Sequence, residues 1–299
     1  MPAGTVARFC SIGYNGPSPA TATYYGSGGF LTATATIEVW STPGAPIRGR
    51  TVVGQPFGLL AQIWPETAPR IALVELLSCR FLGNGGGHRQ SGAFLANVDR
   101  VVVRNCLFDH NGYDGVREPT DCHNLYIHAT CGEIVVENCV FARGGYHGLK
   151  ACTDQAGKRL VVRHNLFLDN PCHIGVGDWG NEPKQAFRGK ASIYGNVIVG
   201  GRVRPSFETI GISVCPVHAD VTIRDNVFGP GVVNPYAVDA GSYRRRGIAE
   251  PVRSARTVAD YLLTLGLRTA DPTAAFVALC LEDFGHRERC MGFIRQGAA

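Results

Sequence analysis

The sequence repeats one eight-residue motif, of which Ile134-Val-Val-Glu-Asn-Cys-Val-Phe141 is a clear copy, six times between Leu73 and Phe228. In every copy the first and third residues are apolar, and the eighth is Phe or Ile. The sixth residue, which we call the anchor, is Cys79, Cys106, Cys139, Asn165, Asn196 and Asn226 in successive copies. The anchors are 26 to 33 residues apart, and a repeat of that length indicates a solenoid or array.

The motif predicts a β-strand with one buried face, because its apolar residues recur with a period of two. Five residues beyond each anchor is an Asn or Gly, and we expect a left-handed backbone at this corner. This corner column is Asn84, Asn111, Gly144, Asn170, Gly201 and Gly231. Stacking the strands about 4.8 Å apart would align the anchor amides in an internal ladder. It would also align an aromatic column of Phe81, Phe108, Phe141, Phe167 and Phe228 in the core.

These repeats resemble the right-handed parallel β-helix family, the pectate-lyase-like superfamily. The resemblance implies an all-β, single-stranded, right-handed parallel β-helix, which we place at residues 71–250. Residues 1–70 contain only short β-like runs and are predicted to form an N-terminal cap with irregular first coils. Beyond Ser254 the apolar residues recur at helical spacing, so residues 251–299 are predicted to be a helical tail packing on the last coil.

The amino-acid composition indicates what type of protein this is and which partners it favours. The 38 glycines and the 18 % of charged residues fit a turn-rich β protein. The net charge of +5 favours an anionic partner such as an acidic glycan, while the dispersed arginines argue against a nucleic-acid partner. No run of 18 apolar residues is present, so no membrane span is expected. No signal peptide is visible, although the resemblance implies an extracellular or cell-surface protein.

The eleven cysteines are interpreted in two groups. Those at the anchors, Cys79, Cys106 and Cys139, are predicted to be buried, reduced packing residues. Two further pairs could form disulfides in an oxidising compartment, namely Cys122 with Cys131 and Cys280 with Cys290. No cysteine spacing is typical of a zinc ribbon, so no zinc site is expected.

A polar column follows the anchors at constant offsets. Eight residues beyond three successive anchors are Asp114, His147 and His173, and eleven residues beyond two of them are Arg117 and Lys150. Stacked coils would bring these side chains to neighbouring-strand distance, where a carboxylate and an imidazole can interact. Two cations on adjacent coils would accommodate a glycan carboxylate between them. Aromatic faces for sugar stacking are offered nearby by Tyr113, Tyr146 and Trp179.

These residues predict a polysaccharide lyase acting on an acidic polysaccharide. In β-elimination His147 would be the base, Asp114 would orient it, and Lys150 and Arg117 would hold the uronate carboxylate. The resemblance implies that Lys150 can exchange roles with His147, because the superfamily often uses Lys or Arg as base. It also implies calcium as a cofactor, but no acidic cluster dense enough for a calcium site is visible.

Two alternatives remain open. A glycoside hydrolase needs two carboxylates about 5–9.5 Å apart, and the acidic residues between Asp114 and Asp178 do not occupy matching columns. A non-catalytic surface or spike protein would use short polar residues before Gly only as turn residues. The outward column of Arg104, Glu137, Arg163, Tyr194 and Arg224 is interpreted as a solvated surface whose charges neutralise one another.

Overall fold

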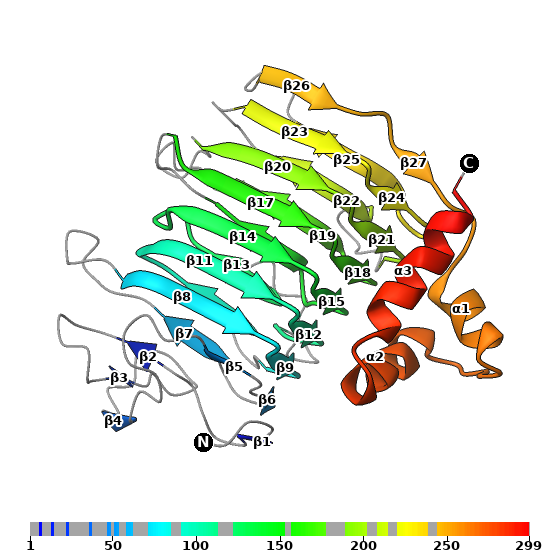
Figure 1. Cartoon of the computed structure of the whole chain (residues 1–299), viewed down its shortest axis with the longest axis horizontal. Helices are drawn as coiled ribbons and strands as arrows, with labels where there is room; N and C mark the ends of the chain where they lie inside the picture. The colour runs from blue at the N-terminus through cyan, green and yellow to red at the C-terminus, as the bar shows by residue number, and fades with distance from the viewer. Residues whose placement is uncertain are drawn as a thin grey trace.

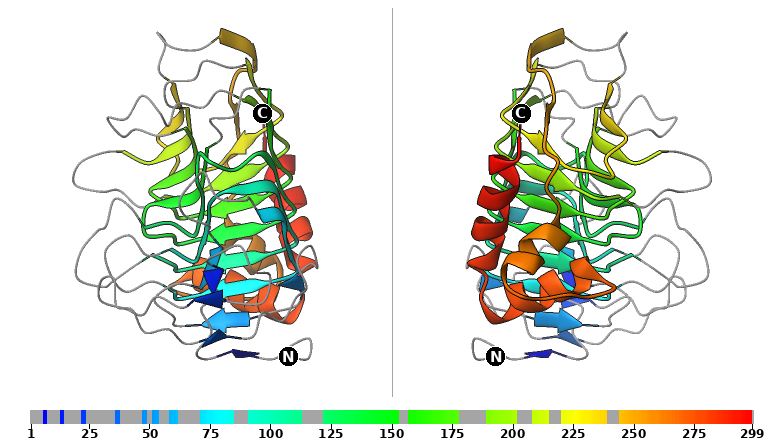
Figure 2. Two further views of the ribbon diagram at one scale, coloured as in Figure 1. Left: turned by 90° about the vertical axis from the view of Figure 1, so that its left-hand side faces the viewer. Right: turned by 90° about the vertical axis from the view of Figure 1, so that its right-hand side faces the viewer.

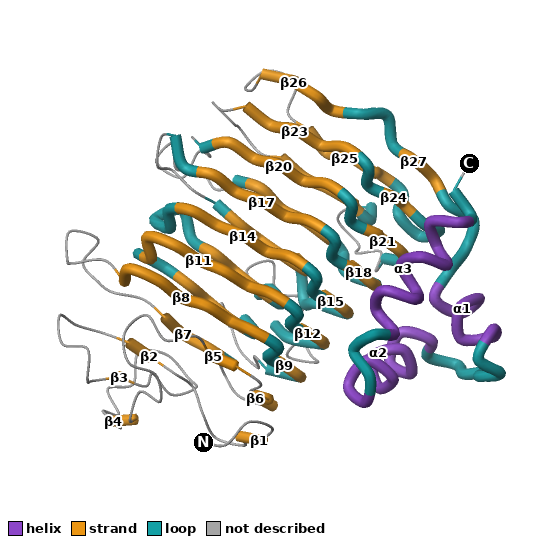
Figure 3. The backbone as a smooth tube through the Cα atoms, in the orientation of Figure 1, coloured by secondary structure: helices purple, strands orange, loops and turns teal. Residues whose placement is uncertain are grey.

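The six motif copies form parallel strands stacked in register, as predicted. The computed structural model describes residues 58–61, 71–84, 91–112, 122–152, 157–177, 189–201, 208–214, 220–238 and 244–298, with several short strands before them. Successive coils build a right-handed parallel solenoid of three sheets, which is drawn in Figure 1 and coloured by secondary structure in Figure 3. The fold class predicted from the repeats is therefore confirmed.

Each complete coil contributes one strand to each of the three sheets. Sheet I contains β1 (Val6–Ala7), β6 (Thr51–Val53), β9 (Arg80–Leu82), β12 (Leu107–Asp109), β15 (Val140–Ala142), β18 (Leu166–Leu168), β21 (Val197–Val199), β24 (Val227–Phe228) and β27 (Val252–Arg253). Sheet II contains β2 (Gly13–Tyr14), β7 (Leu59–Ala61), β10 (Ala93–Leu95), β13 (Leu125–Ile127), β16 (His147–Ala151), β19 (Cys172–Val176), β22 (Ile210–Val214) and β25 (Asn234–Val238). Sheet III contains β5 (Ile47–Arg48), β8 (Ile71–Leu77), β11 (Val98–Arg104), β14 (Glu133–Glu137), β17 (Arg159–Arg163), β20 (Lys190–Tyr194), β23 (Asp220–Arg224) and β26 (Arg244–Ile248). A separate antiparallel pair joins β3 (Ala22–Thr23) to β4 (Thr36–Ile37).

The core between the sheets contains the predicted aromatic column. The rings of Phe108 and Phe141 stack with centroids 5.0 Å apart and planes 8° from parallel. Phe81 and Phe167 extend the stack at centroid distances of 4.8 and 4.9 Å. Ile198 takes the ring's place one coil later and pairs in register with Phe167. The column places large apolar side chains where every coil can bury them.

The anchor side chains form the predicted internal ladder. Asn196 Nδ2 donates to Asn226 Oδ1 at 2.9 Å, and Asn165 Nδ2 donates to Asn196 Oδ1 at 3.1 Å. Cys106 and Cys139 continue the ladder as buried free thiols, as predicted, and burial raises the pKa of Cys106 well above its usual value. Cys280 and Cys290 are also buried free thiols rather than a disulfide, and Cys122 and Cys131 are buried.

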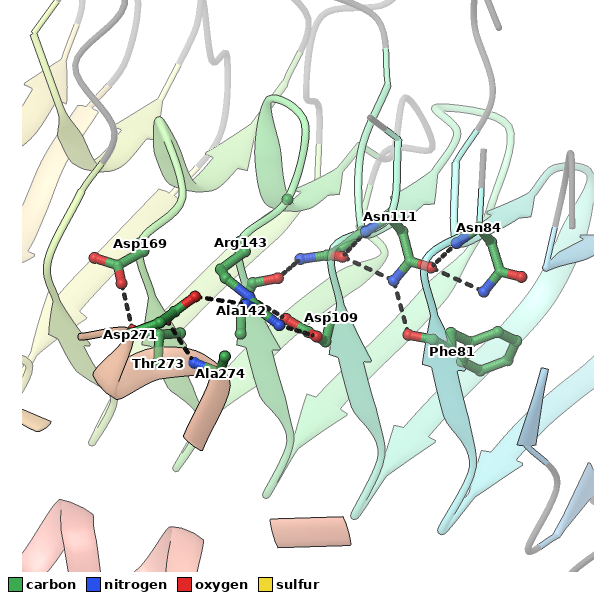
Figure 4. A network of polar contacts seen from close by, with 12 residues as sticks. Phe81, Asn84, Asp109, Asn111, Ala142, Arg143, Asp169, Asp271, Thr273 and Ala274 are labelled. Carbon is green, nitrogen blue, oxygen red and sulfur yellow. Dashed lines mark hydrogen bonds and ion pairs between the residues drawn. The ribbon is translucent and has the colours of Figure 1, made fainter. Parts of the chain in front are cut away.

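The predicted left-handed corner column is wrong at most of its positions. Positive φ angles occur instead one residue before the anchors, at Ser78, Asn105, Asn138, His164, Gly195 and Asp225, and four residues after them, at Gly83, His110, Arg143, Asp169 and Gly200. Of the expected corner residues only Gly231 has a positive φ, of 88°. Asn84 and Asn111 have another role, because their buried amides bond to each other (Figure 4). With Asn124 and Asn170 they form a second ladder. An amide satisfies backbone groups that a buried corner would otherwise leave without partners.

The C-terminal tail consists of α1 (Val258–Thr264), α2 (Pro272–Glu282) and α3 (His286–Gln296). We expected the helical tail to pack on the last coil. The helices instead run along the outer face of sheet I across several coils (Figure 2). The reason is that most of the short strands of sheet I carry apolar residues on both faces. Their outward residues, including Leu107, Val140, Leu166 and Val197, are buried against the helices.

Polar contacts fix these helices to successive coils. Arg143 donates to Asp109 at 2.6 Å and pairs with Asp271 at 3.2 Å, while Asp271 also caps α2 (Figure 4). Thr273 donates to Asp169 one coil further along the solenoid. None of the helices in the described part of the chain is long and apolar enough to cross a membrane.

Candidate functional site

The outer face of sheet II carries a row of residues, one from each coil. Register pairs Phe94 with Tyr126, Tyr126 with Lys150, Lys150 with Gly175, and Gly175 with Ser213. The neighbouring residues Leu125, Leu149 and Ile174 point into the core. The outward row therefore runs from two aromatic rings through a cation to a glycine and a hydroxyl.

Two histidines meet at the start of this row. Extending the pairing of Leu125 with Leu149 back along the strands places His123 beside His147. Their Nδ1 atoms are 3.2 Å apart, and the backbone N–H of His147 also donates to His123 Nδ1 at 3.4 Å. Both side chains are almost fully buried, with 1 % and 2 % of their surfaces exposed.

This geometry assigns protons to the two rings. His123 Nδ1 accepts from the backbone of His147, so it carries a lone pair and not a hydrogen. With His123 Nδ1 as the acceptor, we assign the hydrogen in the short contact between the two Nδ1 atoms to His147 Nδ1. In that tautomer His147 Nε2 carries the lone pair, so it is the ring nitrogen that can accept a proton, and His123 fixes the tautomer.

A glycine makes room for the His147 ring. A Cβ atom added at Gly175 would lie 2.5 Å from His147 Cδ2 and 2.6 Å from Nε2, which is closer than van der Waals contact allows. Gly175 is the residue that pairs with Lys150 in the outward row. The ring of His147 therefore reaches over the next coil and lies across the row that contains Lys150.

Aromatic side chains surround Lys150 and the histidine pair. Lys150 Nζ lies 5.0 Å from the centre of the Tyr126 ring, which is a cation–π distance. Tyr126 also contacts Phe94 edge-on at 5.1 Å and His123 at 5.3 Å. Tyr146 packs edge-on against His147 with centroids 4.2 Å apart. Lys150 and Tyr126 are only partly buried, so both present surface to a ligand.

Of the predicted site residues, the structure brings His147, Lys150 and Tyr146 to this face. His173 does not join them, because His147 pairs with Cys172 and His173 lies one position further along. His173 is buried in the core, where its Nε2 donates to Gly200 O at 3.2 Å and its ring meets Phe167 edge-on. Burial lowers the pKa of His173 to about 3. The remaining predicted residues, Asp114, Arg117, Tyr113 and Trp179, lie outside the described residues.

Counting from the anchors missed His123, Tyr126 and His128. A fixed offset fails where residues are inserted between the anchor and the strand of sheet II. The register and the Nδ1 contact place His123 beside His147. A better signal was available in the alternation of Leu125-Tyr-Ile127, which matches Leu149-Lys-Ala151 residue by residue.

The outward column on sheet III is less solvated than expected. Glu137 is only 4 % exposed, and it accepts from Arg104 and, at 2.6 Å, from Arg163. Burial raises the pKa of Glu137, but the hydrogen bonds from both arginines lower it by more, so its pKa lies below the usual value. Arg163 also donates to the Tyr194 hydroxyl at 3.1 Å, and Arg224 lies over the Tyr194 ring. The charges of this column therefore neutralise one another as expected, and they do so through direct contacts.

The donor set on the outer face of sheet II suits proton transfer and anion binding. The strands β10, β13, β16, β19 and β22 contain no Asp or Glu. Among the described residues no group of three His, Cys, Asp or Glu side chains could hold a metal ion. The calcium that the resemblance implies therefore has no such ligand group among the described residues.

Comparison with known proteins agrees with this architecture. Residues 72–198 match the model of a family described as a right-handed β-helix region. Comparison with curated proteins gave no match, and comparison with solved structures gave none either. The family match over residues 72–198 and the stacked coils agree, and both support a right-handed parallel β-helix.

Proposed function

We propose that the chain binds an acidic, uronate-containing polysaccharide and cleaves it by β-elimination at the outer face of sheet II. The observation that carries this proposal is the Nδ1 contact of His123 with His147, in a row where Lys150 follows two aromatic side chains. A titratable base, a cation and sugar-stacking rings are the groups that such a reaction needs.

The reaction assigns a role to each group. His147 Nε2 removes the proton on the carbon next to the uronate carboxylate, because its Nδ1 is engaged with His123. The electrons of that C–H bond form a C=C bond, the glycosidic C–O bond breaks, and the departing oxygen takes a proton from water. Lys150 stabilises the negative charge that develops on the carboxylate. His123 supplies the orientation at Nδ1 that was expected of Asp114.

Hydrolysis is less well supported than elimination. It requires two carboxylates about 5–9.5 Å apart, and the five sheet II strands nearest the site contain none. Lys150 is partly exposed and His147 is almost fully buried, so Lys150 is the alternative base. An acidic polysaccharide substrate is consistent with an extracellular or cell-surface location, which stays a prediction.

A panel of polygalacturonate, alginate and hyaluronan tests the proposal through the ultraviolet absorbance of the unsaturated product. We expect one polymer to give product, and H147A and K150A to lower its rate by about 10²–10⁴-fold. H286A on α3 is the matched control, because His286 contacts Tyr261 away from sheet II. A chelator arm tests the calcium dependence that the resemblance implies. No absorbance with any polymer, or equal rates for H147A and wild type, would reject the elimination.

A second function, glycan binding without cleavage, is favoured by one observation. His123 Nδ1 accepts the backbone N–H of His147, and Ser91 Oγ accepts the backbone N–H of His123 at 3.1 Å. The column thus also satisfies buried backbone groups, which is a structural role. Binding of a polymer that depends on Tyr126 and Lys150, with no product formed, would select this alternative.

A further inference from the structure

A second cationic region lies on sheet III, apart from the site on sheet II. Arg159 and Lys190 are the first residues of β17 and β20, and they pair directly in register. Both side chains are exposed. Lys158 precedes Arg159, and its carbonyl accepts the backbone N–H of Lys190 at 2.8 Å. Three cations therefore gather at the start of two adjacent strands, and we call Lys158, Arg159 and Lys190 the basic cluster.

The basic cluster forms no ion pair within the described part of the protein. None of its three side chains forms a hydrogen bond or ion pair there. The same row contains Glu133 and Asp220, one coil away on either side, but no ion pair joins Glu133 to Arg159. Like charges directly opposite on neighbouring strands are destabilising, so this arrangement carries a cost in the free protein.

The row of sheet III that contains Glu137 differs, because its cations form ion pairs. There Glu137 lies between Arg104 and Arg163 and pairs with both. The fold thus pairs Arg104 and Arg163 with a buried carboxylate at one end of these strands. Arg159 and Lys190, at the other end, form no ion pair within the described residues. Between the two rows the outward residues Ser192 and Thr222 present hydroxyl groups, which can bond to sugar hydroxyls.

We propose that the outer face of sheet III binds a linear anionic polysaccharide through the basic cluster, as a holding surface separate from the site on sheet II. Closely spaced carboxylates or sulfates would neutralise Arg159 and Lys190 together, which removes their mutual repulsion. Nucleic acid fits this face less well. The one aromatic residue of β11, β14, β17, β20 and β23 is Tyr194, and Arg224 covers its ring at 4.7 Å, so bases find no open stacking platform.

Dextran sulfate is the first probe, because it has no uronate and cannot undergo the proposed elimination. We expect R159Q and K190Q each to weaken its binding about threefold and together about tenfold, as measured by titration calorimetry. The slope of log affinity against log salt should fall by about one for each cation removed. R268Q is the matched control, because Arg268 is exposed in the segment between α1 and α2 and its loss changes the net charge equally.

Each outcome decides the proposal. The holding surface is supported if only R159Q and K190Q weaken binding and if polygalacturonate shows the same pattern as dextran sulfate. This result counts whether or not the chain cleaves polygalacturonate. An equal loss in R268Q would show that only net charge matters and would overturn it. Tighter binding of a DNA duplex than of dextran sulfate, through the same two residues, would overturn the polysaccharide assignment. Thermal unfolding of each variant verifies that the fold is kept.

Discussion

The Nδ1 atoms of His147 and His123 lie 3.2 Å apart across two adjacent coils. Two neutral imidazoles can share only one proton between these atoms, so each ring fixes the tautomer of the other. Because the backbone N–H of His147 points at His123 Nδ1, the direction of the hydrogen bond is set by the fold. The pair is a rigid feature of sheet II, whichever ligand the face binds.

The role of His123 is tested by comparing H123N with H123A. The Oδ1 atom of Asn can occupy the position of His123 Nδ1 and accept both hydrogens, whereas Ala leaves the His147 donor unsatisfied. We expect H123A to lower the elimination rate at least about tenfold more than H123N. Nitrogen NMR shifts of the His147 ring provide a readout that does not depend on activity. Retention of the Nδ1–H tautomer in H123A would contradict the assignment.

Gly175→Ala should displace His147. The new Cβ atom would lie 2.6 Å from Nε2, so the ring has to move while the core residues Ile174 and Val176 stay in place. Loss of turnover, or of ligand binding, with little change in Tm is the expected result. The control is Gly292→Ala on α3, where nothing lies within 4 Å of the new atom. That control should raise helix stability by about 0.5–1 kcal/mol and leave the site unchanged.

The sequence predicted the structure best within the motif copies, where no residues are inserted between one strand and the next. Each motif copy runs from a strand of sheet III through the anchor into a strand of sheet I, without room for insertions. The strands, the Asn ladder and the column that includes Phe108 and Phe141 could therefore be predicted by counting. The corner was misplaced because Asn tolerates a left-handed backbone but is equally suited to a buried amide ladder, and residue type alone cannot separate these roles.

The candidate site was harder to predict because sheet II follows segments of variable length. Asp114 occupies the expected offset from Cys106, yet the strand that pairs with β16 starts only at Leu125. Offsets from the anchors therefore found His147 and Lys150, which lie on a coil with a short connection, and missed His123. His173 has the right offset but sits one residue out of register with His147, so its side chain enters the core.

Phe141→Ala tests the aromatic column. The ring is fully buried and stacks on Phe108 at 5.0 Å and on Phe167 at 4.9 Å, so its removal leaves a cavity between two rigid neighbours. We expect the free energy of unfolding to fall by about 3–5 kcal/mol in urea denaturation. Phe94→Ala is the matched control, because Phe94 is only partly buried on the outer face of sheet II. Equal losses for the two variants would mean that the stack adds nothing beyond ordinary burial.

His173 should make stability depend on pH. Its neutral form donates from Nε2 to Gly200 O and accepts at Nδ1 from Asn170, and burial lowers its pKa to about 3 from an ordinary value of 6.5. The unfolded chain then binds this proton more readily, so stability is full above pH 6.5 and is lost as pH falls toward 3. Linkage predicts a loss of about 2 kcal/mol between pH 7.5 and 5. His173→Gln cannot titrate and should flatten the profile in that window, although its absolute stability is lower. Parallel profiles for the variant and the wild type, measured from urea midpoints, would show that other groups carry the pH dependence.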